Sequence, residues 1–195
     1  MKRSPTQEQR RQQIIDAFIV HVVEKGFHRA SMAEMAKTAG LSVGQVYRYF
    51  SNKEDIIRAV VEQKTEEYLT IMEDFLEKKD WLARIFEQKH SQEFQIERVL
   101  NMEIKAEANR SPVLAEIQSD ADRRLTEHAI KLVRQRYGLQ DEEDILARVQ
   151  FLVALTNGLF HRSNDTDQPF SQASHRLFQH MLNELFPDQV VSTQP

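Results

Sequence analysis

Apolar residues recur every three or four positions along most of the chain, which is the spacing of one face of an α-helix. The first stripe is followed by Gly26 and preceded by Thr6 and Gln9; its members are Ile14, Ile15, Ala17, Phe18, Val22 and Val23. A Thr or Ser followed three residues later by Glu or Gln forms a capping box, and glycine commonly ends a helix. The pattern predicts a helix from Thr6 to about Lys25.

The same signals divide the stretch from Ser31 to Lys53. Three further capping pairs occur there, Ser31 with Glu34, Ser42 with Gln45 and Ser51 with Glu54, and Gly40 lies between the first two. They predict a short helix, a tight turn, a second short helix that carries Gly44 and ends in residues 47–50, and a third, long helix. This layout is that of a helix-turn-helix.

Beyond this motif every segment is again helical in pattern. The long helix runs from Ser51 to about Lys78 and spans about 40 Å. Further helices are expected over 81–89, 91–108, from Ser111 and Pro112 to Tyr137, from about Glu142 to Arg162 and from about Pro169 to Phe186, with a polar loop at 163–168 and a disordered tail. No alternating pattern predicts a strand. We expect an all-α fold with a helix-turn-helix head (residues 1–52) rigidly joined to a helical body (53–195).

Composition narrows the class of protein. Hydrophobic residues make up 41% of the 195, charged residues 29%, and cysteine is absent, which excludes disulfides and thiolate metal sites. No apolar run reaches about 18 residues, and the N-terminus is polar, so we expect a soluble cytoplasmic protein. The net charge is −4, but residues 1–58 carry ten Lys/Arg against six Asp/Glu, while residues 59–195 carry sixteen against twenty-four. A basic head on an acidic body favours DNA binding by the head.

The second helix of the motif carries the chemistry of a DNA reader rather than of an ordinary helical hairpin. Instead of Lys and Glu it offers short polar groups, an aromatic pair and one guanidinium, namely Ser42, Val43, Gln45, Tyr47, Arg48 and Tyr49. Such side chains bind phosphates and base edges. Gln pairs with adenine, Arg with guanine and Val with the thymine methyl, while Gly44 allows a close approach to DNA. For Arg48 a phosphate contact is an equal alternative.

These residues, together with Met35-Ala36, Ala39-Gly40-Leu41, Phe50 and Lys53-Glu54, resemble the N-terminal domain of the TetR (tetracycline-repressor) family over roughly residues 8–60. Met35 and Leu41 replace the Ile and Val typical of that family. The resemblance implies phosphate contacts by Tyr47, Tyr49 and Lys53. The complete predicted DNA-contact set is Ser31, Ser42, Val43, Gly44, Gln45, Tyr47, Arg48, Tyr49 and Lys53.

The resemblance also implies a homodimer built from the last two helices, which are unusually apolar. The predicted interface consists of Phe151, Leu155, Gly158, Leu159, Phe178, Met181, Leu182 and Leu185, the glycine indicating a close approach of helices. Ordinary core packing is the alternative for these positions. A two-fold dimer suits a palindromic operator.

The family further implies a small-molecule effector bound inside the body. The expected lining residues are Tyr68, Met72, Trp81, Phe86, Phe94, Met102, Glu103, Phe151, Asn157 and His161. For each apolar member taken singly, ordinary core packing is the favoured alternative, whereas the polar ones need partners when buried. The ligand itself stays unidentified.

Motifs of catalysis are missing from the sequence: it has no HExxH, GxSxG or glycine-rich phosphate loop. We therefore expect no enzyme, no catalytic residues, no metal and no cofactor. The predicted function is a DNA-binding transcriptional regulator, a dimeric repressor released by an effector. The alternatives are a constitutive or structural DNA-binding protein without an effector, an activator, and an adaptor whose head contacts another protein.

Overall fold

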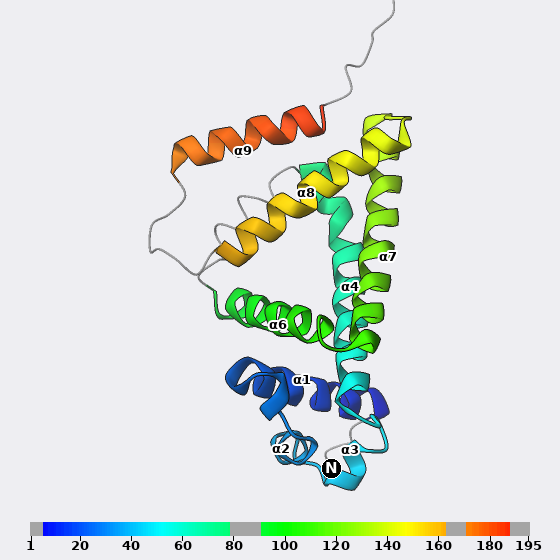
Figure 1. Ribbon diagram of the computed structural model, residues 1–195, viewed down its shortest axis with the longest axis vertical. Helices are drawn as coiled ribbons and strands as arrows, with labels where there is room; N and C mark the ends of the chain where they lie inside the picture. The colour runs from blue at the N-terminus through cyan, green and yellow to red at the C-terminus, as the bar shows by residue number, and fades with distance from the viewer. Residues whose placement is uncertain (1–5, 79–90, 163–170, 188–195) are drawn as a thin grey trace, which may run out of the picture. The chain divides into compact units, whose positions relative to one another are not determined.

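The computed structural model describes residues 6–78, 91–162 and 171–187 (Figure 1), all in helices and their connections, with no strand among them. The elements are α1 (Gln7–Lys25), the 3₁₀ turn η1 (Phe27–Arg29), α2 (Met32–Thr38), α3 (Val43–Val46), α4 (Lys53–Lys78), α6 (Gln92–Ala108), α7 (Pro112–Tyr137), α8 (Glu142–Arg162) and α9 (Gln172–Leu185). The all-α prediction is confirmed. The predicted helix over 81–89, the loop at 163–168 and the tail lie outside the described residues. None of the described helices is long and apolar enough to cross a membrane.

Capping chemistry sets most of the helix ends, as the sequence predicted. Complete capping boxes join Thr6 to Gln9, Ser31 to Glu34 and Ser42 to Gln45. The glycines that follow α1, α2 and α7 all have positive φ, which a residue with a Cβ rarely adopts: 79° at position 26, 65° at 40 and 67° at 138. Local sequence therefore fixes where these helices begin and end.

Three predicted boundaries were wrong. α4 begins at Lys53, and Asn52 caps it instead of Ser51: the Asn52 side chain accepts the Asp55 N–H at 2.8 Å, and the Asp55 carboxylate accepts the Ser51 N–H at 3.0 Å. α3 is a single turn, because residues 48 and 49 bond back three residues rather than four and tighten the chain. α9 begins at Gln172, capped by Ser171, and not at about Pro169.

The chain forms two compact units. The first comprises the described residues up to Glu66 together with Gln95–Ala121, and the second comprises Glu67–Phe94 and the residues from Asp122 onward. The unit that holds the helix-turn-helix is thus larger than the predicted head of residues 1–52. α4 is one unbroken helix that contributes residues to both units.

The first unit packs α1, α2, α3 and the first part of α4 with α6 and the start of α7. Its core is one cluster of buried side chains, whose largest fully buried members include Ile14, Phe18, Met35, Ile56 and Leu114. Val46 and Phe50 are 0% and 3% exposed, which confirms their predicted core positions. The short helices α2 and α3 are therefore held by tertiary packing.

The second unit has its own core where α7, α8 and α9 meet. Tyr137 packs on Phe186 with ring centroids 5.3 Å apart, beside buried Val133, Ile145 and Val149. At the C-terminus of α9 the guanidinium of Arg148 donates to the carbonyl oxygens of residues 184 and 185, where the helix has unpaired acceptors. This contact fixes the end of α9 to α8.

Candidate nucleic-acid interface

The turn between α2 and α3 positions the second helix of the motif. Gly40, at φ 65°, donates its N–H to the carbonyl of Lys37 at 3.2 Å, and Leu41 donates to Ala36 at 2.9 Å. The side chains of Ala36 and Val46 are then buried on the inner side of the motif. The turn thereby leaves the opposite side of α3 open to solvent.

The outer side of α3 presents most of the predicted DNA contacts together. Val43 is 40% exposed and Tyr47 is 52% exposed, both high values for large apolar or aromatic side chains. Ser42, Gly44, Gln45 and Arg48 are exposed beside them, while Tyr49 is half-buried against the core. This is a small surface of mixed polar and aromatic groups on a one-turn helix.

Gly44 has no packing role in the described structure. A Cβ at this position would meet no atom within 4 Å, and its φ is not in the left-handed region. Folding therefore does not require glycine here, and the open space on its outer side is available to a partner.

Gln45 serves two predicted purposes at once. Its Oε1 accepts the Ser42 backbone N–H at 2.9 Å and the Ser42 hydroxyl at 3.1 Å, so it forms part of the cap of α3. Pairing with adenine uses both the oxygen and the nitrogen of a Gln amide. In this conformation the oxygen is engaged, and the Nε2 group is the end that extends from the cap.

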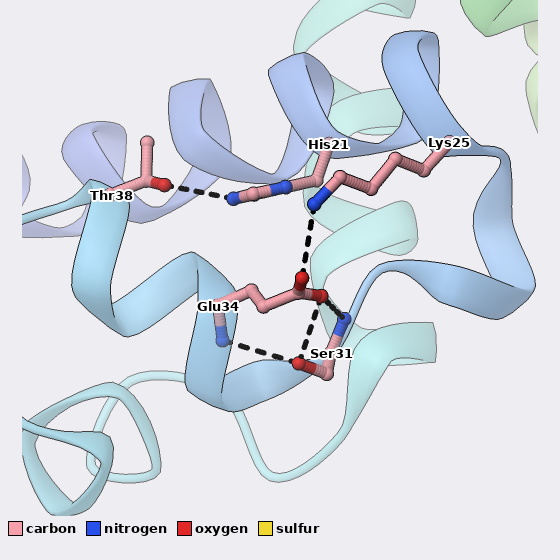
Figure 2. A network of polar contacts seen from close by, with 5 residues as sticks. All are labelled: His21, Lys25, Ser31, Glu34 and Thr38. Carbon is pink, nitrogen blue, oxygen red and sulfur yellow. Dashed lines mark hydrogen bonds and ion pairs between the residues drawn. The ribbon is translucent and has the colours of Figure 1, made fainter.

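A polar network joins α1 to α2 at the other end of the motif (Figure 2). The carboxylate of Glu34 accepts from the Lys25 ammonium at 3.0 Å and from the Ser31 hydroxyl at 3.1 Å, while Nε2 of His21 lies 2.8 Å from the Thr38 hydroxyl. The hydrogen bond from Lys25, followed by those from Ser31, lowers the pKa of Glu34. Ser31, a predicted DNA contact, therefore caps α2 and directs its hydroxyl proton to Glu34.

Lys53, another predicted phosphate contact, is bound to the head itself. Its ammonium donates to the carbonyl of Phe27 at 3.0 Å and lies 4.4 Å from the centre of the Phe27 ring. An ammonium has three N–H donors, so this contact positions the group and leaves donors for a phosphate.

The corner between α1 and α2 is also held from α6, which the sequence did not predict. Glu103 accepts the Phe27 N–H at 3.1 Å, and Glu107 lies 3.1 Å from the His28 ring and 3.5 Å from Arg110. Glu103 was expected to line an effector pocket; its carboxylate instead binds this corner. The contacts of Glu103 with Phe27 and of Glu107 with His28 join residues more than 70 positions apart, so no local pattern indicates them.

The remaining predicted ligand residues are divided between the two units. Met102, like Glu103, belongs to the first unit and is 43% exposed. In the second unit Phe94 is buried, and its ring centroid lies 4.9 Å from that of Phe160. Phe151 is 49% exposed. The half-buried members are Tyr68, Met72, Asn157 and His161. Trp81 and Phe86 lie outside the described residues. No cluster of three or more possible metal ligands occurs in the part of the chain that the structure describes.

The predicted dimer residues separate into two kinds. Leu182 is 2% exposed, so the protomer itself buries it and its prediction as an interface residue was wrong. Leu185 packs against the core of the second unit but stays half-buried. Gly158 is exposed, and a Cβ there would meet nothing within 4 Å. Phe151, Leu155, Leu159, Phe178 and Met181 keep exposed or half-buried surface.

Comparison with known proteins agrees with this geometry. The model of "Bacterial regulatory proteins, tetR family" matches residues 14–60. The fatty acid metabolism regulator protein of Bacillus subtilis (strain 168) is 37% identical over 67 residues, which is 34% of each chain. The transcriptional regulator BetI of Escherichia coli O127:H6 is 25% identical over 199 residues, covering 96% of this chain and 99% of BetI.

Solved structures extend the similarity of fold to the whole chain. Salmonella enterica GusR superposes with a TM-score of 0.76 at 23% identity, covering 93% of this chain and 97% of GusR. The multidrug binding protein EbrR complexed with malachite green gives a TM-score of 0.65 at 22% identity, covering 92% and 99%. The motif, the helical fold and these relatives all indicate a TetR-family regulator, a protein that binds DNA and controls transcription.

Proposed function

We propose that the protein is a dimeric repressor that binds a palindromic operator through α3 and leaves it when a small molecule binds its helical body. The observation that carries the proposal is the exposed surface of α3, where Val43 and Tyr47 face solvent within a head of positive charge. An exposed aromatic and a branched apolar residue on one helical turn favour a partner. The charge identifies that partner as nucleic acid.

Phosphate contacts and base contacts have separate residues in this proposal. Tyr47, Tyr49, Ser42 and Lys53 bind the backbone and set the register without reading sequence. Val43 and Arg48 face base edges. Gln45 reads through its Nε2 group while its oxygen stays in the cap, so we expect it to select an acceptor in the major groove, such as guanine O6 or thymine O4, rather than to pair with adenine at both atoms.

The dimer interface lies on α8 and α9. Its residues are Phe151, Leu155, Gly158, Leu159, Phe178, Met181 and the half-buried Leu185, which is the predicted set without Leu182, the leucine that the protomer buries. The exposure of Phe151 in the protomer supports this assignment, because a large apolar side chain gains stability when a partner covers it. Two heads related by a two-fold axis then read two half-sites.

We place effector binding in the body, which is residues 53–195 in the division by function. The EbrR complex with malachite green supports a ligand in a chain of this fold, although it does not identify the ligand here. A ligand that binds one arrangement of the dimer more tightly shifts the population toward it, which is how release from DNA follows. The unbroken α4 supports mechanical continuity between body and head.

The test is fluorescence anisotropy of the full-length protein on DNA from immediately upstream of its gene, over a series of salt concentrations. We expect tight binding that weakens steeply with salt and is lost in Tyr47→Ala. Arg48→Ala is expected to reduce the preference for operator over random DNA, and Arg123→Ala, an exposed residue of α7 paired with Glu127, is the control. Absence of binding to any DNA at low salt contradicts the proposal and favours the protein adaptor.

A further inference from the structure

One buried cation on α6 has no counter-charge among the described residues. Arg98 is 8% exposed, and its only partner there is the Gln95 side-chain oxygen, which accepts from Nε at 3.2 Å and from Nη2 at 2.8 Å. A guanidinium has five N–H donors. Two of these N–H groups donate to Gln95. The two N–H groups on Nη1 and the second one on Nη2 have no acceptor among the described residues.

Three of the four carboxylates of α6 are engaged elsewhere, and the fourth, Glu93, makes no ion pair with Arg98 within the described residues. Glu97, the adjacent residue, lies 3.8 Å from the Lys64 ammonium. Glu103 accepts the Phe27 N–H, and Glu107 pairs with His28 and Arg110. Arg98 therefore receives a neutral amide oxygen where a buried cation ordinarily has an anion.

We propose that Arg98 binds the carboxylate of the effector, which is then a small monoanionic organic acid. The inference rests on the proposed effector-binding function and names the chemical class of the ligand. The unused N–H groups lie on the terminal edge of the guanidinium, where Nη1 and Nη2 form the fork that a carboxylate binds with two parallel hydrogen bonds. Gln95 orients that fork from the adjacent edge, formed by Nε and Nη2.

The charge of the site favours a carboxylate over a more highly charged anion. One guanidinium supplies a single positive charge, and the Lys64 ammonium is already paired with Glu97 at 3.8 Å. A cationic ligand at the same place suffers like-charge repulsion by a group that water screens poorly. The site thus separates organic acids from amines and from neutral analogues.

The experiment uses the full-length protein with benzoate and hexanoate as probes, and with benzamide and hexanamide as neutral compounds of matched shape. Binding is measured by thermal melting and by titration calorimetry in wild type, Arg98→Gln, Arg98→Lys and the surface control Arg123→Gln. We expect the acids and not the amides to raise the melting temperature of wild type and of Arg123→Gln. In Arg98→Gln the affinity for the acids is expected to fall about 10- to 100-fold, and Arg98→Lys, which keeps the charge without the fork, lies between.

The unliganded variant gives a second readout. If the protein leaves the charge of Arg98 uncompensated, Arg98→Gln without ligand melts at the same temperature as wild type or above it, because a buried charge has been removed. A clear drop in its melting temperature shows that the protein itself satisfies Arg98 and overturns the inference. Equal responses to acids and amides, no response to any of the four compounds, or unchanged affinity in Arg98→Gln overturn it as well.

DNA release separates this inference from the proposed function. Operator DNA is added to each variant, and anisotropy is followed during titration with the four compounds. A neutral compound that releases DNA equally from wild type and Arg98→Gln leaves the regulator function standing and refutes the role of Arg98. Wild type that binds no DNA refutes the regulator function, whatever the acids do to its melting temperature.

Discussion

The carboxylate of Glu103 accepts a hydrogen bond from the backbone N–H of Phe27 at 3.1 Å, across 76 positions of sequence. The Phe27 carbonyl accepts from Lys53 on its other side. One residue of the corner between α1 and α2 is thus held by α6 through its N–H and by α4 through its C=O. We therefore expect a displacement of α6 to reach the short helices that follow this corner.

Removing the Glu103 carboxylate is therefore expected to weaken the head. Glu103→Ala leaves the Phe27 N–H without this acceptor and lowers the free energy of unfolding by about 1–2 kcal/mol. DNA affinity falls with it, because the position of Lys53 depends on the same residue. Urea unfolding and operator anisotropy measure the two effects, with the exposed neighbour Met102→Ala as control. Equal stability of the two variants contradicts this role.

Glycines 44 and 40 are expected to respond in opposite ways to alanine. Gly44→Ala adds a methyl group in open space, so stability stays level or rises by up to about 1 kcal/mol. Its operator affinity nevertheless falls, because the methyl group lies on the side proposed to meet DNA. Gly40→Ala forces a Cβ into φ 65° and lowers stability by about 1–2 kcal/mol. A Gly44→Ala protein that binds operator as tightly as wild type removes Gly44 from the interface.

Gly158→Leu is expected to separate the dimer without unfolding the protomer. The protomer has open space at this position, so circular dichroism should show unchanged helix content. A large side chain at a close helix contact between subunits prevents their approach, and sedimentation velocity should show monomers. Ala115→Leu, the same kind of enlargement at an exposed position of α7, is the control and stays dimeric. A dimeric Gly158→Leu protein places the interface elsewhere.

Acid is expected to cancel the contribution of Glu34. Because the pKa of this carboxyl is lowered in the folded protein, its stabilising effect is present above the ordinary value of 4.5 and is lost as the pH falls through the folded value. Glu34→Gln should therefore be less stable than wild type at neutral pH, and the difference should shrink below pH 4.5. Urea unfolding at several pH values measures it. A difference that is constant with pH assigns the effect to the cap alone.

The fold was predictable because its helix boundaries are encoded locally. Thr6, Ser31 and Ser42 cap the helices that the sequence indicates, and Gly26 and Gly40 end them. The error at α4 has a local cause as well. Ser51 with Glu54 and Asn52 with Asp55 have the same spacing, and both are capping pairs, so spacing alone does not choose between them.

The site was predictable only where one helix carries it. The outward residues at α3 follow from the seven consecutive positions from Ser42 to Arg48, whereas the partners of Glu103 and Glu107 are set by the packing of α6 within the first unit. Leu182 shows the same limit, because an apolar stripe does not reveal whether a partner subunit or the protomer covers it. The burial of Arg98 was only weakly indicated by the sequence, which places this charged residue four positions after Phe94, a buried residue of the same helix.

Because α3 is a single turn, we expect operator binding to be lost at a lower temperature than most of the helical structure. A four-residue segment does not form a helix alone, since nucleation is unfavourable and no further residues extend it. Its shape depends on Val46 and Phe50 staying in the core. If the first unit opens partly around Val46 and Phe50, the exposed DNA-contact surface of α3 is lost while most of the chain remains helical. Repression should therefore decline at a lower temperature than the circular dichroism signal of the helices.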